Sequence, residues 1–428
     1  MVSEQEFERL KADYERLKTG IQELAILNEI ATTISSTIDL DRIIETIVKK
    51  CITHFNVDQG NISLISHQEM AAPLQTMVRQ YDSDAGRIPF RLDQQLIGWM
   101  LAKKEPLIIN DISQDTRFAF LGNDIPYKSL ICVAMMYKGK LIGVLSLFNK
   151  RNNESFDKND LRLLSIIATE SSQVIENARL LEEEKKLLSV TEELRISGLI
   201  QQKLLPSNLP DIKGYQVAAS NIPAKEVGGD YYDVIKIDEH KFAFCFGDVS
   251  GKGMPAALLM SNLQATIRSL MLSNHDPALI VQQTNTLIHA TTTSDKFITF
   301  FLGILDVKNN VFDYCNAGHD KPLDYNSGSF QELQTGGVPL GFLQHFDYQK
   351  YSMTFNQNQI LVIYTDGVTE AMNRNEDEFG LDNVKSIVKN NQDKSAREIL
   401  DAILEAIDNH ASGAEQMDDI TMIVLKKN

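Results

Sequence analysis

Aspartates stand at the ends of apolar segments at three well-separated positions in the second half of the chain. Asp248 and Asp366 each end a segment that predicts a buried strand, and a glycine follows each of them within three residues. The pair Asp418-Asp419 directly precedes the last apolar segment of the chain. A single turn of this kind is common at strand ends and does not by itself indicate a metal site. Three together favour carboxylates that folding gathers as ligands of a hard cation.

A fourth acidic turn, Gly228-Gly229-Asp230, comes shortly before the strand that ends at Asp248. The glycine-rich turn after Asp248 leads into a predicted helix with Pro255 in its first turn. Glycines in both turns would let backbone carbonyls and water approach a cation closely. The two turns therefore belong with the aspartates as parts of one candidate site.

Five segments in this order carry a family resemblance: GGDYYD, FGDVSGKGMPAALLM, NAGHDKPL, YTDGVTEA and DDITMIVL. Together they resemble the SpoIIE-like subgroup of the PPM (protein phosphatase 2C type) serine/threonine phosphatases, over roughly residues 198–428. The chain departs from this family at Asp320-Lys321, where the family usually has Asn-Pro. That loop carries no metal ligand of the family, so the departure bears on substrate preference more than on catalysis.

The resemblance implies a PPM-type α-β-β-α sandwich with a centre of two Mg²⁺ or Mn²⁺ ions at one edge. Asp248 would bridge the ions, Asp230 and the Val249 carbonyl would hold the first, and Asp366 and Asp418 would hold the second. The motif favours the first acid of the final pair, and which of the two is the ligand stays open. The residues implied as ligands are Asp230, Asp248, Val249, Asp366, Asp418 and Asp419.

Two metals about 3.5–4 Å apart would activate a shared water, so no protein nucleophile is needed. Neither Ser250 nor Cys245 has a histidine partner in any of the motifs. His319 would either protonate the leaving oxygen or stabilise a turn. Asp233 and Glu370 would either support the ligands or be solvated.

Length and composition bound the remaining possibilities. A chain of 428 residues with 43% hydrophobic content predicts two or three globular domains, and no apolar run is long enough to span a membrane. The net charge of −16 argues against nucleic acid or an anionic membrane as partner. Four scattered cysteines and a polar N-terminus favour a reduced cytoplasmic protein.

The first half of the chain predicts a different domain. A helix over Asp39–Thr53, a strand over Gly60–Ile65 and a hairpin of Leu130–Tyr137 with Lys140–Phe148 resemble a GAF sensory domain. Residues near Asn149 partly match a signature of cyclic-nucleotide GAF domains, but Leu161 replaces its final glutamate. A hairpin exit and a helix cap at Asp157 or Asn159 are the simpler interpretation.

Two segments predict helices that pair with a partner helix. Residues 1–26 carry a short heptad seam, which favours a coiled coil or a helix packed on a neighbour, with a single amphipathic helix as the alternative. A long helix is predicted over Asp160–Leu205, and its apolar seam from Leu164 to Leu188 favours a coiled coil that couples sensor to phosphatase. The seam residues of the first segment are Phe7, Leu10, Tyr14, Leu17, Ile21 and Leu24.

The predicted architecture is therefore α+β, with an N-terminal helix (1–26), a GAF domain (27–177), a coiled-coil linker (178–205) and a phosphatase domain (206–428). We expect a homodimeric, cytoplasmic, metal-dependent protein serine/threonine phosphatase under GAF control. Its expected substrate is a phosphorylated anti-sigma-factor antagonist, and the GAF ligand is not identified. The alternatives are a non-catalytic scaffold and a dimeric receptor for a cyclic nucleotide or another small molecule.

Overall fold

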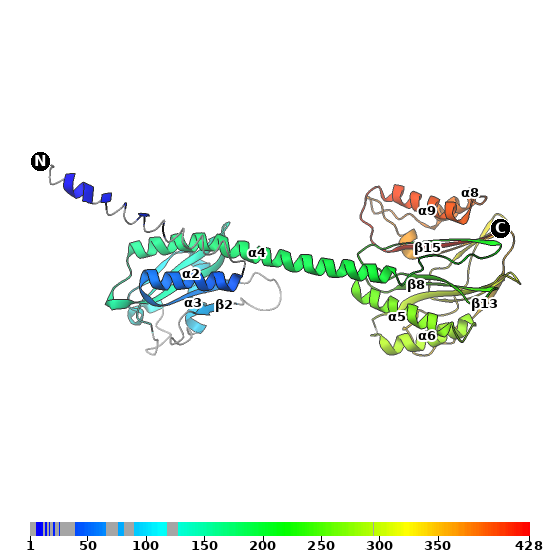
Figure 1. Cartoon of the computed structure of the whole chain (residues 1–428), viewed down its shortest axis with the longest axis horizontal. Helices are drawn as coiled ribbons and strands as arrows, with labels where there is room; N and C mark the ends of the chain where they lie inside the picture. The colour runs from blue at the N-terminus through cyan, green and yellow to red at the C-terminus, as the bar shows by residue number, and fades with distance from the viewer. Residues whose placement is uncertain are drawn as a thin grey trace. The chain divides into compact units, whose positions relative to one another are not determined.

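The computed structural model describes residues 6–11, 13–14, 17, 20–21, 25, 39–65, 76–80, 90–117, 127–293 and 295–428 (Figure 1). The chain divides into two compact units, residues 1–188 and 189–428. The boundary falls inside the segment predicted as a linker. In the described part of the chain, no helix is long and apolar enough to cross a membrane.

The first unit is built on one antiparallel sheet of five strands in the order β2-β1-β5-β4-β3. Leu164, Ile167 and Ala168 of the helix α4 join α2 in the core cluster on this sheet. The predicted hairpin and the helix after Asp39 are both present, and Asp39 accepts hydrogen bonds from the first turn of α2. The elements are α2 (Leu40–Phe55), β1 (Val57–Ile65), β2 (Thr76–Gln80), α3 (Phe90–Lys103), β3 (Leu107–Ile109), β4 (Leu130–Tyr137), β5 (Lys140–Lys150) and α4 (Lys158–Gln202), with short 3₁₀ turns at Ile112–Gln114 and Arg151–Asn153.

The end of β5 and the start of α4 fit the helix-cap interpretation. Asp157 accepts a hydrogen bond from the backbone N–H of Asn159 at 2.8 Å and another from Asp160 at 2.8 Å. Lys150 forms an ion pair of 2.5 Å with Asp160. These contacts give the polar residues of this segment a structural role in joining the sheet to α4.

α4 is an unbroken helix of 45 residues, as the periodicity predicts, but its apolar seam has two different environments. Leu164 and Ala178 are buried in the core of the first unit, whereas Leu181 and Leu188 are 51% and 63% exposed. Only the later part of the seam is therefore free for a partner helix. In the N-terminal segment, Leu24 lies outside the described residues, and the other seam residues are between 61% and 70% exposed.

The second unit contains two antiparallel sheets of five strands, ordered β13-β10-β9-β8-β7 and β12-β11-β14-β15-β6. Aromatic and aliphatic side chains from both sheets form one buried layer between them, with Phe244 and Phe312 from the first and Ile363 and Ile423 from the second. The strands are β6 (Tyr215–Ile222), β7 (Tyr231–Lys236), β8 (Lys241–Val249), β9 (Ile298–Asp306), β10 (Val311–Ala317), β11 (Leu323–Asn326), β12 (Ser329–Glu332), β13 (Tyr351–Thr354), β14 (Ile360–Tyr364) and β15 (Ile420–Lys427).

Helices cover the outer face of each sheet (Figure 1). α5 (Met254–Leu270) and α6 (Pro277–Thr291) pack on the sheet that contains β8, and α8 (Leu381–Asn390) and α9 (Ala396–Ala411) pack on the sheet that contains β15. The single turn α7 (Asp366–Thr369) follows β14. This four-layer arrangement confirms the predicted α+β class and the α-β-β-α sandwich.

Candidate metal centre

The register of the two sheets brings the predicted aspartates to one edge of the sandwich. Tyr231 of β7 pairs with Gly247 of β8, so Asp230 lies beside Asp248. In the other sheet, Tyr364 of β14 pairs with Met422 of β15, so Asp366 comes to the same end as the final acidic pair. Carboxylates from four separate segments therefore meet where the sheets adjoin.

Burial and the repulsion between neighbouring carboxylates raise the pKa values of Asp230, Asp248 and Asp366. The pKa of Asp248 rises to about 7, first because the group is buried and then because Asp366, Asp418 and Asp419 are close to it. The pKa of Asp230 is raised well above its usual value by burial and by the charges of Asp248 and Asp419. Such a group of carboxylates is electrostatically unfavourable unless protons or cations compensate it.

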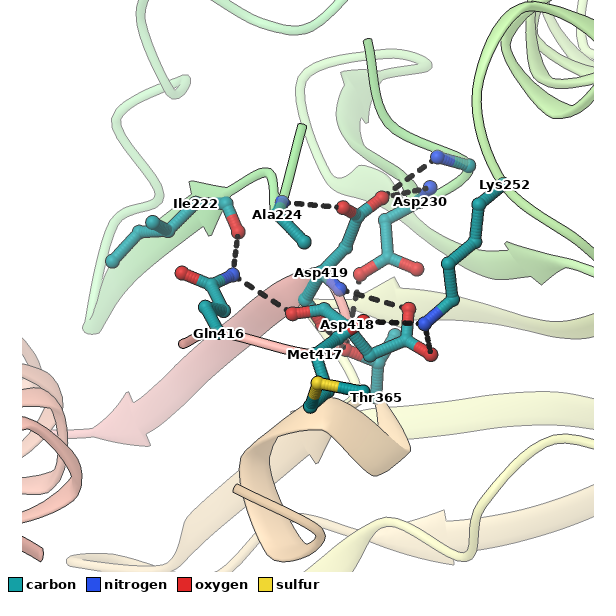
Figure 2. A network of polar contacts seen from close by, with 10 residues as sticks. Ile222, Ala224, Asp230, Lys252, Thr365, Gln416, Met417, Asp418 and Asp419 are labelled. Atoms are coloured by element: carbon teal, nitrogen blue, oxygen red, sulfur yellow. Dashed lines mark hydrogen bonds and ion pairs between the residues drawn. The ribbon is translucent and has the colours of Figure 1, made fainter. Parts of the chain in front are cut away.

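Asp418 is compensated by a lysine (Figure 2). The Nζ of Lys252 lies 2.8 Å from the Asp418 carboxylate, and it also donates a hydrogen bond to the Met417 carbonyl. Among the described residues, no three acidic, imidazole or thiolate groups are already close enough to form a metal-binding cluster. Lys252 and a cation would therefore compete for the Asp418 carboxylate.

Asp419 has a different role from its neighbour. Its Oδ1 accepts a hydrogen bond from the Ala224 N–H at 2.8 Å, and its Oδ2 accepts from the N–H groups of Gly229 at 2.7 Å and Asp230 at 3.3 Å (Figure 2). Both oxygens are thus occupied by backbone donors. Asp419 ties the first acidic turn to the start of β15.

Asp230 is held by two hydroxyl groups from the other sheet. Its Oδ2 accepts hydrogen bonds from Thr421 and, at 3.0 Å, from Thr365. Its side chain is only 3% exposed. The two threonines fix the orientation of this carboxylate without neutralising its charge.

Asp320, at the position where the sequence departs from the family, lies in the same electrostatic environment. Burial and the nearby charges of Asp366 and Glu370 raise its pKa to about 6. The departure therefore adds a carboxyl group close to the candidate site.

His319 is a structural residue. Its Nε2 lies 3.1 Å from the Tyr364 carbonyl, which can only accept a hydrogen bond, so Nε2 carries the proton and Nδ1 accepts from the Thr299 hydroxyl at 2.9 Å. Burial lowers the pKa of His319 to about 4. The neutral ring with both nitrogens occupied fits the turn-stabilising alternative and not the acid.

The other residues considered from the sequence are also accounted for. Cys245 is fully buried, and burial raises the pKa of its thiol well above the usual value. Asp233 is buried and paired with Arg268 at 2.8 Å, whereas Glu370 is exposed. The Ser250 Oγ accepts a hydrogen bond from the Phe297 N–H at 3.0 Å. Among the described residues, none of these groups has a partner that would activate it as a nucleophile.

Lys252 and Asp418 line two neighbouring pockets. The smaller one is bounded by acidic residues and by the glycines of both turns, including Gly229, Gly251 and Gly253. The larger one has a volume of about 400 Å³ and extends towards α9 along an apolar wall that includes Leu404 and Ile407. The larger pocket therefore offers room for part of a substrate beside the acidic residues, whereas the smaller one, at about 10 Å³, has room for no more than about one water molecule.

Sequence reasoning missed the partners of the aspartates. Lys252 stands inside a recognised motif, and a single cation within an acidic cluster could have drawn attention to it. Thr365 directly precedes Asp366, but its contact with Asp230 depends on the pairing of segments 135 positions apart. No local signal indicates such a contact.

Comparison with known proteins finds a matching family for each half of the chain. Residues 238–428 match the family described as Stage II sporulation protein E (SpoIIE), and residues 39–175 match the GAF domain family. The phosphoserine phosphatase RsbU of Bacillus subtilis is 29% identical over 241 residues, which cover 56% of this chain and 71% of that protein. Protein IcfG of Synechocystis is 31% identical over 264 residues, covering 55% of this chain and 42% of that protein.

The fold has a counterpart among solved structures. The SiaA-PP2C domain of Pseudomonas aeruginosa superposes with a TM-score of 0.50 and 19% sequence identity, covering 57% of this chain and 99% of that domain. At this identity the likeness concerns the fold alone. Together with the family matches, it shows that the chain combines a GAF domain with a SpoIIE-type phosphatase domain of the PPM (protein phosphatase 2C type) serine/threonine class.

Proposed function

We propose that this protein is a serine/threonine phosphatase that uses two Mg²⁺ or Mn²⁺ ions to hydrolyse phosphoserine or phosphothreonine on a protein. The observation that carries the proposal is the convergence of Asp248, Asp366 and Asp418 at one edge of the sandwich, where burial and the charges of the neighbouring aspartates raise the pKa of Asp248 to about 7. Buried carboxyl groups that repel one another favour binding of divalent cations, which would restore the ionised form.

The donor set fits such ions. The candidate ligands are all oxygens, the kind that Mg²⁺ and Mn²⁺ prefer, and they come from rigid strand ends. Asp230, Asp248, Asp366 and Asp418 would hold the ions together with the Val249 carbonyl. The occupied oxygens of Asp419 support a positioning role for it and favour Asp418 as the ligand. When bound, the two ions would lower the pKa of a shared water and neutralise the phosphate.

Other residues of the protein would orient the metal ligands and bind the phosphate group. Thr365 and Thr421 orient the carboxylate of Asp230, and Asp419 holds the backbone that carries it. Lys252, once released from Asp418, would be free to pair with a phosphate oxygen of the substrate. Neutral, buried His319 holds the loop before Asp320 and transfers no proton to the leaving group.

We further propose that the substrate is a phosphorylated anti-sigma-factor antagonist. RsbU, which is named a phosphoserine phosphatase, supports the phosphoserine part of this proposal. The net charge of −16 would repel any phosphoprotein until cations neutralise the site, so turnover should depend strictly on metal.

The GAF domain would control this activity through α4 in a homodimer. Exposed apolar residues on the later part of α4, among them Leu181, Leu187 and Leu188, support pairing with α4 of a second copy. The four cysteines are free and buried, which supports a reducing, cytoplasmic location.

Phosphate release from a phosphoserine protein, measured with and without Mn²⁺, tests the proposed function. Wild-type protein should release phosphate only with metal. Asp248→Asn or Asp366→Asn should lower the rate by at least about 100-fold, because loss of a metal ligand should reduce activity at least as much as loss of a residue that supports a ligand. Circular dichroism should show that both variants remain folded. Activity close to wild type in either variant would remove the two-metal assignment, and a folded, inactive wild type would favour a non-catalytic scaffold.

A further inference from the structure

The last turn of α4 contacts the glycine turn that precedes Asp230. Gln201 is only 9% exposed, and its side chain makes two hydrogen bonds to one residue, Gly228. Its Nε2 donates to the Gly228 carbonyl at 2.6 Å, and its Oε1 accepts from the Gly228 N–H at 3.0 Å. These two partners allow only one orientation of the amide. A single side chain thereby satisfies both backbone groups of Gly228.

A second contact brings the same helix turn against the same loop. A Cβ atom on Gly198 would lie 2.0 Å from the carbonyl oxygen of Glu226, which is closer than any side-chain carbon can approach. Only glycine at position 198 allows the helix backbone to lie so near the loop. Val227, between the two contact points, is buried. The end of α4 thus packs directly on residues 226–228.

The loop held in this way leads straight to the acidic centre. A Cβ atom on Gly228 would lie 2.6 Å from Oδ2 of Asp419, and the same oxygen accepts hydrogen bonds from the N–H groups of Gly229 and Asp230. Gly229 also leaves room for the Val249 carbonyl, since its Cβ would be 3.1 Å from that oxygen. Residues 228–230 therefore lie between Gln201 on one side and Asp419 on the other.

We propose that Gln201 is a positioning residue of the metal centre, which acts through Gly228 to hold Asp230 and the surroundings of the Val249 carbonyl in place. Two consecutive glycines give the loop more backbone freedom than other residues would, so it needs outside contacts to present a carboxylate in one position. Asp419 supplies those contacts from β15, and Gln201 supplies them from the helix that links the two domain types. The inference rests on the proposed function, because the group that Gln201 positions is a metal ligand.

Manganese calorimetry on the metal-free, full-length protein tests this role with three variants. Gln201→Met keeps the length of the side chain and removes both hydrogen bonds. Gln202→Met makes the same change at the exposed neighbouring position and serves as the matched control. Gly198→Ala disturbs the same helix–loop contact without touching Gln201. Thermal unfolding of each metal-free variant reports any general loss of stability.

We expect Gln201→Met to bind Mn²⁺ about tenfold more weakly than wild type, as loss of an outer support of a metal ligand does. Gly198→Ala should weaken binding in the same direction, and Gln202→Met should bind like wild type. At saturating Mn²⁺ most of kcat should return, and KM for a small aryl phosphate should stay unchanged.

A lower unfolding temperature with unchanged Mn²⁺ affinity would overturn the inference, because Gln201 would then be structural only. Equal weakening by Gln202→Met would also overturn it, since the effect would belong to the helix in general. A wild type that binds no Mn²⁺ overturns it as well. If wild type binds Mn²⁺ but releases no phosphate from phosphoserine proteins, the proposed function fails, while the comparison of the variants still decides the role of Gln201.

Discussion

Lys252 and Asp418 form an ion pair of 2.8 Å at the mouth of the acidic pocket, where Asp418 is a candidate metal ligand. The lysine also lowers the pKa of Asp366, which burial and Asp418 otherwise raise. It therefore stands in for part of the positive charge that divalent cations would supply. A cation entering the site would compete with this lysine for Asp418.

The first prediction concerns this competition. Lys252→Gln should bind Mn²⁺ several-fold more tightly than wild type in calorimetry, because Asp418 no longer has to leave a cationic partner. Its KM for a phosphoprotein should rise, because the lysine is no longer there to contact phosphate. Lys350→Gln is the matched control, since Lys350 forms a similar ion pair of 2.8 Å with Asp276 outside the acidic pocket. Weaker Mn²⁺ binding by Lys252→Gln would mean that the lysine positions Asp418 for the metal.

The second prediction follows from the raised pKa values. In the metal-free protein the pKa of Asp248 is about 7 and that of Asp320 is about 6, so both groups carry protons at pH 6 and are largely ionised at pH 8. A cation favours the ionised form, so its binding must release more protons at pH 6 than at pH 8. Apparent Mn²⁺ affinity should accordingly rise with pH across this range.

Calorimetry in two buffers with different ionisation enthalpies measures the proton release directly. Asp320→Asn removes one titrating group and one of the charges that raise the pKa of Asp248. This variant should release fewer protons at pH 6 and show a shallower dependence of affinity on pH. Equal proton release at pH 6 and pH 8 in the wild type would show that the acidic groups do not titrate as the structure implies.

The sequence indicated the aspartates of this site because each stands at the end of an apolar segment, and Asp230, Asp248 and Asp366 also adjoin a glycine, which is a local pattern. Their partners could not be predicted in the same way. Thr421 and Asp230 are separated by 191 positions, and Gln201 and Gly228 by 27, so these hydrogen bonds exist only once the sheets and α4 are packed. Residue type alone does not identify which threonine or glutamine will meet a ligand.

The seam of α4 shows a second limit of sequence reasoning. Apolar residues at three- and four-residue spacing form a stripe whether the helix packs on its own domain or on a partner helix. Leu164 and Ala178 pack on their own domain, whereas Leu181 and Leu188 are exposed and available to a partner helix. Ser171 is fully buried, and its hydroxyl has no hydrogen-bond partner among the described residues. The period predicts the helix and its apolar face but not what covers that face.

The third prediction separates attack by water from covalent catalysis. Ser250→Ala removes the hydroxyl group that follows Asp248 in its motif and should keep most of the phosphatase rate, because that hydroxyl accepts a hydrogen bond from the Phe297 N–H and is thereby held in a structural contact. Cys245→Ser should likewise keep most of the rate in folded protein, since the thiol is fully buried. Rapid acid quench during turnover is the direct measurement. A trapped phosphoenzyme would contradict hydrolysis by water.

The last prediction concerns α4, which runs without a break from the first unit to Gln202. An α-helix turns about 100° per residue, so two residues inserted after Glu184 rotate everything beyond them by about 200°, whereas seven residues nearly restore the original face. If exposed Leu181 and Leu188 pair with a second copy, the seven-residue insertion should keep dimerisation and whatever GAF-dependent regulation the wild type has. The two-residue insertion should lock the phosphatase in one activity state, because Leu188 and the turn that carries Gln201 would face a new direction relative to Leu181. Sedimentation gives the oligomeric state, and Mn²⁺-dependent phosphate release gives the activity. If both insertions leave regulation equally intact, α4 acts only as a tether between the two domains.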